Sequence, residues 1–440
     1  MAYNTYIVLT GTMLLGIVSG VVGSFAVLRR RALMGDALSH AALPGICLAF
    51  LVIGDRHFVA LLIGAVVTGT LGVLVVAVLR TATRIKEDAA IGIVLSVFFG
   101  AGIVLSRMIQ NLPSGNRAGL DSFIFGKTAG MIRADVILIG WTAAAVLAAT
   151  LLLFKEFKLL SFDREFGAVQ GWPVLVLDIM MMALLVVTTV IGLPAVGVVL
   201  MAALLIIPGA AARFWTDRLP IMLILSALFG GTTGAAGSFI SAYFDSSVLP
   251  LPAGPVIVLV GAVIFVVSML AAPRRGVLAR LWRRLRLRER IAHQNLLRSM
   301  YELTEENVLA RPAVALSALT ARRGWTPRLA RKVARSGARR GAVEPAGTDR
   351  FRLTESGVEQ AASVVRSHRL WELYLIDQAS IPADHVDRDA DTIEHFLPSE
   401  IVQQLEARLS ESGRWPRGSK LPPKSPHVIE PLSNQPRETL

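Results

Sequence analysis

Cysteine and phosphate-binding loops are what this sequence most clearly lacks. Cys47 is the only cysteine among 440 residues, which excludes a disulfide framework and a thiolate metal cluster, because both need several thiols. Cys47 is most simply a small apolar core residue. No stretch fits the P-loop pattern G-x-x-x-x-G-K-[ST], so the chain is not itself a P-loop nucleotide hydrolase.

Charged residues are scarce in the first part of the chain and frequent in the rest. Residues 1–272 contain 16 Lys and Arg and 12 Asp and Glu, a net charge of +4, whereas residues 273–440 contain 29 and 20, a net charge of +9. The chain is 53% hydrophobic with a mean hydropathy of +0.57, which is too apolar for an ordinary soluble protein. The change near Pro273 separates a membrane domain from a basic soluble domain.

A helix that spans a bilayer needs roughly 20 mostly apolar residues. Nine stretches meet this requirement, and nine spans would place the chain ends on opposite sides. The first is long with no basic residue before it, so we expect a span and not a cleaved signal peptide. Pro44 lies within the second, and Pro194 crowds the start of the seventh. Small residues in segments such as 16–24, 69–72 and 230–241 predict close helix packing. The predicted spans are 5–28, 37–54, 58–79, 89–108, 134–154, 173–191, 193–212, 218–243 and 253–272.

Basic residues in short connections mark the cytoplasmic side of a membrane protein. Such residues follow the first, third, fifth, seventh and ninth predicted spans, which all end on one face. We therefore expect the N-terminus outside and the basic domain in the cytoplasm. Segment 109–133 departs from this pattern, because it carries three basic residues on the other face. The clusters are Arg29, Arg30 and Arg31; Arg80, Arg84 and Lys86; Lys155, Lys158 and Arg164; Arg213 and Arg218; Arg274 and Arg275.

An acid, an imidazole and a proline occur together in "LMGDALSHAALPGI" (33–46). Asp36 and His40 are four residues apart, so they share one helix face, and a carboxylate with a neutral imidazole suits Mn, Fe or Zn. Pro44 clashes with the carbonyl of His40, which could then face a wet cavity. The alternative is that Asp36 caps the helix start and His40 reaches the nearby interface.

The connection "LLSFDREFGAVQGWP" (159–173) joins two predicted spans. Its first half can form a short amphipathic helix, with Asp163 as N-cap and Leu160, Phe162 and Phe166 as apolar contacts. Such a segment can lie on the membrane or dock into a groove of a partner. Composition does not separate these two alternatives.

The soluble domain contains a pattern of helix, turn and helix followed by a short hairpin and a helix that begins at Thr354. The turn is at Gly324–Trp325, and Thr326 is placed to cap the second helix. A basic second helix of this kind could lie in a DNA major groove; the alternative is a solvated basic face or a protein-contact module. The basic residues of this helix are Arg328, Arg331, Lys332 and Arg335.

Two later segments have the spacing of metal ligands. His368 and Glu372 are four residues apart, as are Asp391 and His395, with Glu394 between them. Two such helices could enclose a metal of the Mn, Fe and Co class. The alternative is a set of surface salt bridges with the neighbouring arginines Arg366, Arg369 and Arg388.

The motif "GDALSHAALPGI" resembles the signature of the permease subunits of manganese, zinc and iron ABC importers, the ABC-3 family. The resemblance covers residues 5–272 and includes "EDAAIGI", "SFIFG", "SFDREFG" and "LLIIPGAAA". It implies that Asp36 and His40 lie on the metal path and that 161–171 docks on a separate ATPase subunit. The residues that match the docking pattern are Asp163, Glu165, Phe166 and Gly171.

Residues 289–410 resemble the iron- and manganese-dependent repressors of the diphtheria toxin repressor family. The resemblance implies one metal site at His368 and Glu372, and a second to which Asp391, Glu394 and His395 contribute. Two departures concern the ligands. Asn295 and Arg298 stand where the family's first helix supplies acidic or sulfur ligands, which weakens the link from metal to the DNA-binding helices. Asp387 stands at a histidine ligand position, with His385 two residues earlier.

These features predict an all-α polytopic membrane domain of about eight or nine transmembrane helices, followed by a cytoplasmic α+β winged-helix domain with helical metal-binding and dimerisation segments. The expected divisions are a permease domain, a basic juxtamembrane linker, a winged-helix-like domain, metal-binding and dimerisation helices, and a disordered tail: 1–272, 273–288, 289–357, 358–412 and 413–440.

We expect the permease subunit of an ATP-driven importer of divalent transition metal in the bacterial inner membrane. Its partners would be an ABC ATPase, an extracytoplasmic metal-binding protein and a second permease, identical or homologous. The soluble domain would sense metal and inhibit transport, or bind DNA. No catalytic residue and no tightly bound cofactor are expected; the metal is substrate and regulatory ligand. The alternatives are a membrane-tethered metal-dependent transcription regulator and an ion-driven carrier, which the docking segment disfavours.

Overall fold

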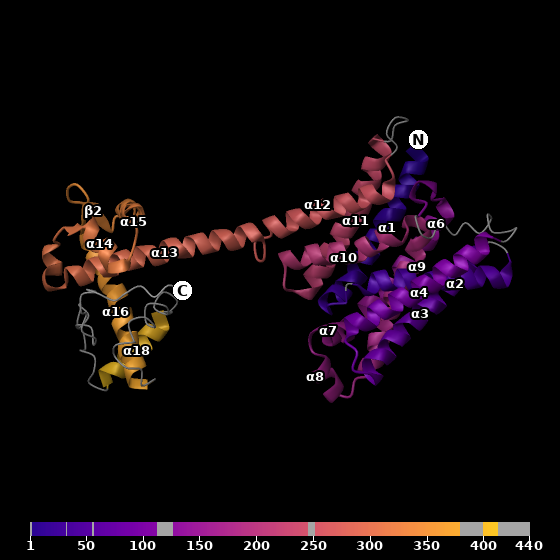
Figure 1. The fold of residues 1–440 in the computed structure, drawn as a ribbon, viewed down its shortest axis with the longest axis horizontal. Helices are drawn as coiled ribbons and strands as arrows, with labels where there is room; N and C mark the ends of the chain where they lie inside the picture. The colour runs from indigo at the N-terminus through magenta and orange to yellow at the C-terminus, as the bar shows by residue number, and fades with distance from the viewer. Residues whose placement is uncertain are drawn as a thin grey trace. The chain divides into compact units, whose positions relative to one another are not determined.

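The computed structural model describes residues 2–31, 33–54, 57–111, 126–244, 251–378 and 399–411. The chain divides into two compact units, Met1–Leu281 and Trp282–Leu440, here called the membrane unit and the soluble unit. Helices dominate both units (Figure 1). The boundary lies close to the change in charge near Pro273.

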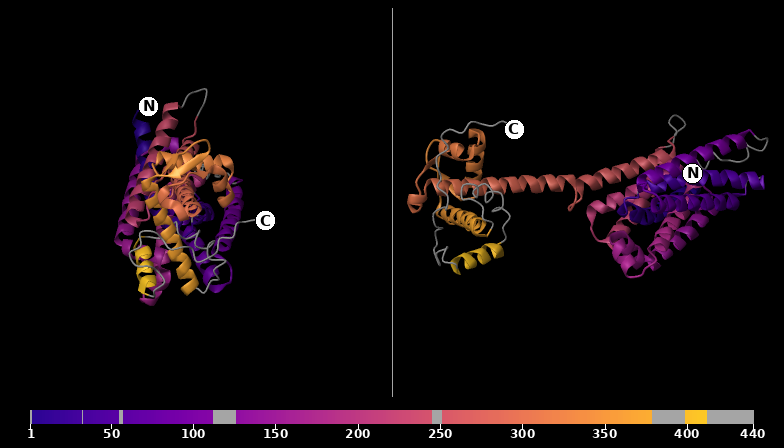
Figure 2. Two further views of the ribbon diagram at one scale, coloured as in Figure 1. Left: turned by 90° about the vertical axis from the view of Figure 1, so that its left-hand side faces the viewer. Right: turned by 60° about the horizontal axis from the view of Figure 1, so that its bottom comes forward.

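The membrane unit is a bundle of long apolar helices, which Figure 2 shows from two further directions. Eight helices in the described ranges are long and apolar enough to cross a bilayer. They are α1 (Ala2–Leu28), α2 (Met34–Ile53), α3 (Phe58–Ala82), α4 (Glu87–Gln110), α6 (Arg133–Leu152), α9 (Val174–Val196), α11 (Leu219–Phe244) and α12 (Ala253–Ala271). Between them lie η2 (Thr128–Gly130), α7 (Phe154–Phe162), α8 (Arg164–Val169) and α10 (Val198–Trp215).

The predicted seventh span corresponds to α10, which has 18 residues. At 1.5 Å per residue α10 is about 27 Å long, slightly short of the roughly 30 Å hydrocarbon core. Pro194, predicted at the start of this span, lies instead in the last turn of α9. The break falls at Gly197, whose φ of 80° is a conformation that glycine adopts without steric cost. Pro44 lies inside α2 and does not end it.

Small residues allow the backbones of neighbouring helices to approach closely. A Cβ atom on Gly16 of α1 would lie 2.0 Å from the carbonyl oxygen of Gly230 in α11, and one on Gly45 of α2 would lie 2.0 Å from that of Gly64 in α3. A buried hydroxyl pair also joins α1 to α11, with the Oγ atoms of Ser24 and Ser226 2.7 Å apart. The predicted packing through small residues is therefore confirmed.

The soluble unit contains a small antiparallel sheet of order β1-β3-β2, in which Val314 pairs with Phe351 and Val343 with Leu353. The Oγ1 of Thr326 accepts a hydrogen bond from the Leu329 amide at the start of the second helix, so the predicted cap and hairpin are confirmed. α13 (Val277–Leu303) begins in the membrane unit and continues into the soluble unit. The other elements are η3 (Glu305–Ala310), β1 (Val314–Ala315), α14 (Leu316–Arg323), α15 (Pro327–Arg339), β2 (Val343–Pro345), β3 (Arg350–Leu353), α16 (Glu355–Gln378) and α18 (Ser399–Glu411).

Candidate functional site

Asp36 and His40 lie on consecutive turns near the start of α2. The Nε2 atom of His40 is 3.6 Å from Oδ1 of Asp36, and the two side chains are 22% and 37% exposed. This separation is too long for a hydrogen bond. The N-cap of α2 is Leu33, and no side chain caps the helix, so the interpretation of Asp36 as a helix cap is not supported. Asp36 and His40 therefore share one helix face, as predicted, but are not hydrogen-bonded to each other.

The surroundings of His40 hold the ring but leave one of its nitrogens unused. Phe99 of α4 packs edge-on against the imidazole, with ring centroids 4.7 Å apart. The Nδ1 atom of His40 is buried and has no hydrogen-bond partner among the residues that the structure describes. A buried polar atom without a partner is costly. This nitrogen is therefore a position at which water or a ligand would be stabilised.

The pair alone does not complete a metal site. Transition metals in proteins generally take four or more ligands, and within the described ranges no group of three or more His, Cys, Asp or Glu side chains comes together. Asp36 and His40 can supply two ligands. The remaining ligands must come from water, from backbone carbonyls or from another chain.

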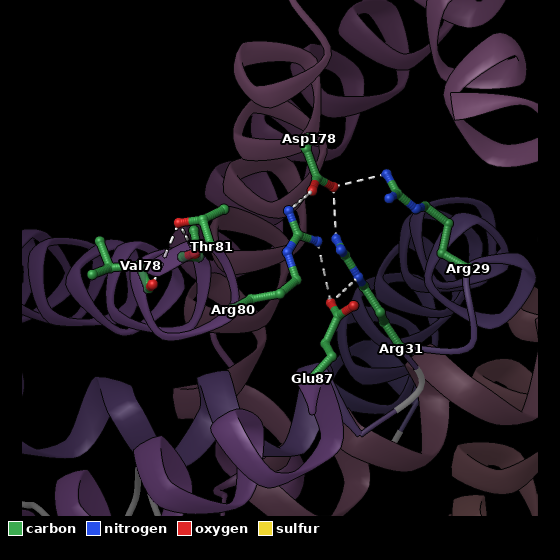
Figure 3. Close-up of polar contacts among 8 residues, drawn as sticks. Arg29, Arg31, Val78, Arg80, Thr81, Glu87 and Asp178 are labelled. Carbon is green, nitrogen blue, oxygen red and sulfur yellow. Dashed lines mark hydrogen bonds and ion pairs between the residues drawn. The ribbon is translucent and has the colours of Figure 1, made fainter. Parts of the chain in front are cut away.

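Five charged side chains form a network (Figure 3), and Met34 at the start of α2 lines the same small pocket. Asp178 of α9 is at its centre: its Oδ1 accepts from Arg29 at 2.8 Å and from Arg31 at 2.6 Å, and its Oδ2 accepts from Arg80 at 3.3 Å. Glu87 at the start of α4 pairs with both Arg31 and Arg80. This ion network joins the chain after α1 to the end of α3 and to the starts of α4 and α9.

The ion network is largely buried, which makes its charges dependent on one another. Burial, and after it the neighbouring Arg31, lower the pKa of Arg29 to about 10, and Asp178 opposes this shift. Arg164 of α8 also contributes to lowering the pKa of Arg29. Removing one partner of a buried ion pair leaves an uncompensated charge and is strongly destabilising.

Four of these five residues stand out in the sequence only as loop charges or motif letters, and Asp178 was missed. The available signal was a single acid in the apolar stretch "VLVLDIMMM" (174–182), because a charge inside a span is costly and normally has a partner. The partners could not be found from the sequence, since Arg31 lies 147 positions away.

The predicted docking segment forms the short helices α7 and α8. The Oδ1 of Asp163 accepts a hydrogen bond from the Phe166 amide at 2.9 Å, so the predicted N-cap is confirmed. Phe162, Phe166, Val169 and Trp172 are all exposed. Gly171 has a φ of 82°, which favours glycine at the turn that ends α8. Glu165 is also exposed. The segment therefore presents an apolar surface held by a defined turn.

His368 and Glu372 on α16 contact each other in the interior of the soluble unit. The Nε2 of His368 is 2.9 Å from Oε1 of Glu372, and the two side chains are 2% and 0% exposed. The expected ligands Asp391, Glu394 and His395, together with His385 and Asp387, lie outside the described residues. The structure therefore gives the geometry of the His368–Glu372 pair, and the residues of the second predicted metal site lie outside the described residues.

Arg298 lies in the core of the soluble unit and forms a buried ion pair. Its Nε donates to Oε1 of Glu302 at 2.7 Å, and Nη2 of Arg322 on α14 donates to Oε2 at 3.0 Å. Burial acts to raise the pKa of Glu302, but Arg298 and Arg322 outweigh it and hold this pKa below its ordinary value of 4.5. The guanidinium groups of Arg298 and Arg322 therefore neutralise Glu302, and the bond from Arg322 connects α14 to α13. The Oδ1 of Asn295 is buried without a partner in the described part of the chain.

The second helix of the winged-helix pattern, α15, carries the predicted basic face. Arg328, Lys332 and Arg335 are exposed. Arg331 instead forms an ion pair with Asp349, which precedes β3, at 2.9 Å. Three of the four predicted basic residues therefore extend into solvent, and the fourth braces the hairpin.

Comparisons with known proteins agree with this architecture. A family model described as the ABC 3 transport family matches residues 1–272, and one described as iron dependent repressor, metal binding and dimerisation domain matches residues 354–423. The manganese transport system membrane protein MntC of Bacillus subtilis is 39% identical over 420 residues, which cover 95% of this chain and 94% of that protein.

Two further relatives each match somewhat less than two thirds of the chain. The zinc transport system membrane protein TroC of Treponema pallidum is 47% identical over 65% of this chain and 94% of that protein. The solved structure of PsaBC from Streptococcus pneumoniae in complex with Fab is 34% identical, covers 62% of this chain and 93% of that chain, and has a TM-score of 0.54.

Fold and matches together define a polytopic membrane subunit of an ABC transporter, with a domain of the metal-dependent repressor type at its C-terminal side. The predicted fold class is confirmed. The chain belongs to the ABC 3 transport family. It is a translocation subunit and not an enzyme, and ATP hydrolysis belongs to a separate subunit.

Proposed function

We propose that this chain is the permease of an ATP-driven importer that carries a divalent transition metal, Mn, Fe or Zn, into the cytoplasm. The observation that carries this proposal is the Asp36–His40 pair: an acid and an imidazole on one face of a buried helix, 3.6 Å apart and not bonded to each other. This donor set suits all three metals. The names of the relatives, manganese and zinc transport systems, agree with it.

A second permease copy, or a homologous permease, completes the path. The pair offers two ligands, and a partner that offers an equivalent pair would raise the number to four, a common coordination for such metals. An extracytoplasmic metal-binding protein delivers the ion. Passing metal needs ligands that can release it, and a partly exposed pair meets this need better than a closed cage.

The ATPase subunit binds the segment 161–171. Phe166 and Val169 are 51% and 87% exposed, and apolar anchors of this kind provide much of the energy at small interfaces. Asp163, Glu165 and Gly171 shape the segment around them.

The orientation follows from the basic clusters. The ion network gathers Arg29, Arg31 and Arg80 in one place, which supports a common side for the ends of α1 and α3. By the positive-inside rule this side is the cytoplasm, so the N-terminus lies outside. With α10 as a ninth crossing beside the eight longer helices, the soluble unit lies inside. The chain then resides in the bacterial inner membrane.

The soluble unit senses cytoplasmic metal through His368 and Glu372, joined by Asp391, Glu394 and His395, and inhibits transport. DNA binding is a second candidate function, which the exposed Arg328, Lys332 and Arg335 favour. Glu302 of α13 is already neutralised by Arg298 and Arg322, so it offers no free carboxylate through which a metal could act on the DNA-binding helices. DNA affinity would therefore depend little on metal. Replacing one phosphate-binding cation by a neutral residue should make the slope of log affinity against log salt shallower by about 0.9.

Reconstitution tests the main proposal. The chain is incorporated into liposomes with its ATPase and binding protein, and uptake of radioactive Mn, Fe and Zn is followed with each metal as competitor. We expect saturable uptake that requires ATP. Uptake of none of the three metals, or uptake that continues without the ATPase, contradicts the proposal.

A further inference from the structure

The first half of α13 carries an exposed apolar stripe. Four large side chains spaced three or four positions apart lie on one face of this helix, and each is about half exposed. They are Leu278 at 57%, Leu281 at 52%, Trp282 at 57% and Leu285 at 49%. A stripe of this kind in water is unfavourable, because removing large apolar side chains from water is favourable.

The rest of this segment is strongly basic. Residues 280–290 contain six arginines and one acid, Glu289, a net charge of +5. Arg286 lies over the ring of Trp282 at 3.5 Å from its centroid, so the guanidinium and the indole occupy one edge of the stripe. The arginines are all exposed: Arg280, Arg283, Arg284, Arg286, Arg288 and Arg290.

The start of α13 is tied to the end of the last spanning helix. α12 ends at Ala271, and the Gly276 amide donates to the Ala272 carbonyl at 2.9 Å, while the Arg280 amide donates to the Gly276 carbonyl at 3.0 Å. A Cβ on Gly276 would lie 2.3 Å from that Ala272 oxygen, so the turn is close. The apolar stripe therefore begins within a few residues of the bilayer surface.

We propose that residues 277–290 form an interfacial helix that binds anionic lipid, with the stripe of Leu278, Leu281, Trp282 and Leu285 among the headgroups and upper acyl chains. Basic amphipathic helices with Trp and Leu on the apolar face bind in this manner. Each arginine near a negatively charged leaflet strengthens this binding. The positive charge selects an anionic membrane over a neutral one. This proposal does not depend on which ion the chain transports.

Spin labelling of the full chain tests the proposal. Cys47 is replaced by Ala, and single cysteines are introduced at Leu278, Leu281 or Leu285 on the stripe and at Arg280 or Arg284 on the basic face. Labelled protein is placed in nanodiscs of phosphatidylcholine with or without 30% phosphatidylglycerol. We expect stripe labels in anionic discs to be accessible to oxygen and shielded from a water-soluble nickel chelate, and basic-face labels to show the reverse.

Two reference labels calibrate the measurement. A label at Leu259, which is exposed on α12, reports the hydrocarbon, and one at Lys332 on α15 reports water. In neutral discs, and in anionic discs with Arg280, Arg284, Arg286 and Arg288 changed to Gln, we expect the stripe labels to shift toward the water reference. Stripe labels that contact the nickel chelate in anionic discs overturn the proposal. Labels shielded from both reagents also overturn it, because they indicate a protein partner. Equal immersion in neutral discs overturns the preference for anionic lipid.

Discussion

A histidine and an acid four residues apart on a helix occur in both units of this chain, in opposite surroundings. On α2, His40 and Asp36 are 3.6 Å apart and partly exposed. On α16, His368 and Glu372 are 2.9 Å apart and almost completely buried. The two pairs have the same spacing in the sequence, yet one is open to a ligand and the other is part of a packed interior.

The difference corresponds to two tasks. Cargo must be bound and released in every transport cycle, and an open pair with an unused nitrogen permits both. The buried pair is enclosed in its unit, and removing one partner of a buried pair is strongly destabilising. Loss of the open pair should therefore abolish transport with little effect on folding, whereas loss of the buried pair should chiefly lower the stability of the soluble unit.

The largest effect expected is on transport. Asp36→Ala and His40→Ala should each reduce metal uptake to background, because each removes one of two ligands on the path. The measurement is radioactive metal uptake normalised to the amount of protein in the membrane. Ser39→Ala, which removes a hydroxyl bonded only within the same helix turn in the described structure, is the matched control and should retain uptake. Wild-type rates in both ligand variants would show that the pair is not on the path.

The buried pair should dominate stability. Glu372→Ala removes a buried carboxylate bonded to His368 and should lower the free energy of unfolding of the soluble unit by roughly 3 kcal/mol. Asp36→Ala should change stability by less than about 1 kcal/mol, because its pair is partly exposed. Thermal unfolding of the full chain in detergent measures both. If the two variants melt alike, burial does not distinguish the pairs.

Interface chemistry gives an effect of intermediate size. Phe166→Asp places a charge where an apolar anchor is expected and should weaken ATPase binding by about 2 kcal/mol, or roughly 30-fold. Co-purification and stimulated ATPase activity are the readouts. Lys158→Asp, which changes charge on the exposed face of α7, serves as control. Unchanged assembly of the Phe166 variant would favour the membrane as the surface on which α8 lies.

Sequence reasoning succeeded where an interaction is local. The Thr326 cap, the Asp163 cap and the shared face of Asp36 and His40 depend on residues within four positions, so spacing was sufficient. Composition likewise predicted the membrane helices, because a run of about twenty apolar residues is stable chiefly within the hydrocarbon core of a bilayer.

Sequence reasoning failed where the interaction is distant or depends on burial. The ion network joins Arg31 to Asp178 across 147 positions, and no local pattern connects them. The pairs on α2 and α16 have the same spacing, so the spacing could not predict that one is open and the other buried. The predicted spans end at 191 and restart at 193, whereas the backbone turns at Gly197.

The smallest effect expected is a change in acid stability that depends on Glu302. Because its pKa in the folded chain lies below the ordinary value of 4.5, the carboxylate stabilises the fold fully above that value, and this contribution is lost as the pH falls through the folded pKa. Glu302→Gln cannot ionise, so its stability should change less between pH 6 and pH 3 than that of the wild type. Urea unfolding at several pH values, with tryptophan fluorescence as the signal, measures this difference. Glu344→Gln, which alters an acid in an exposed ion pair with Arg352, should follow the wild-type curve. Parallel curves for wild type and Glu302→Gln would show that the guanidinium groups of Arg298 and Arg322 do not stabilise the charged form of Glu302.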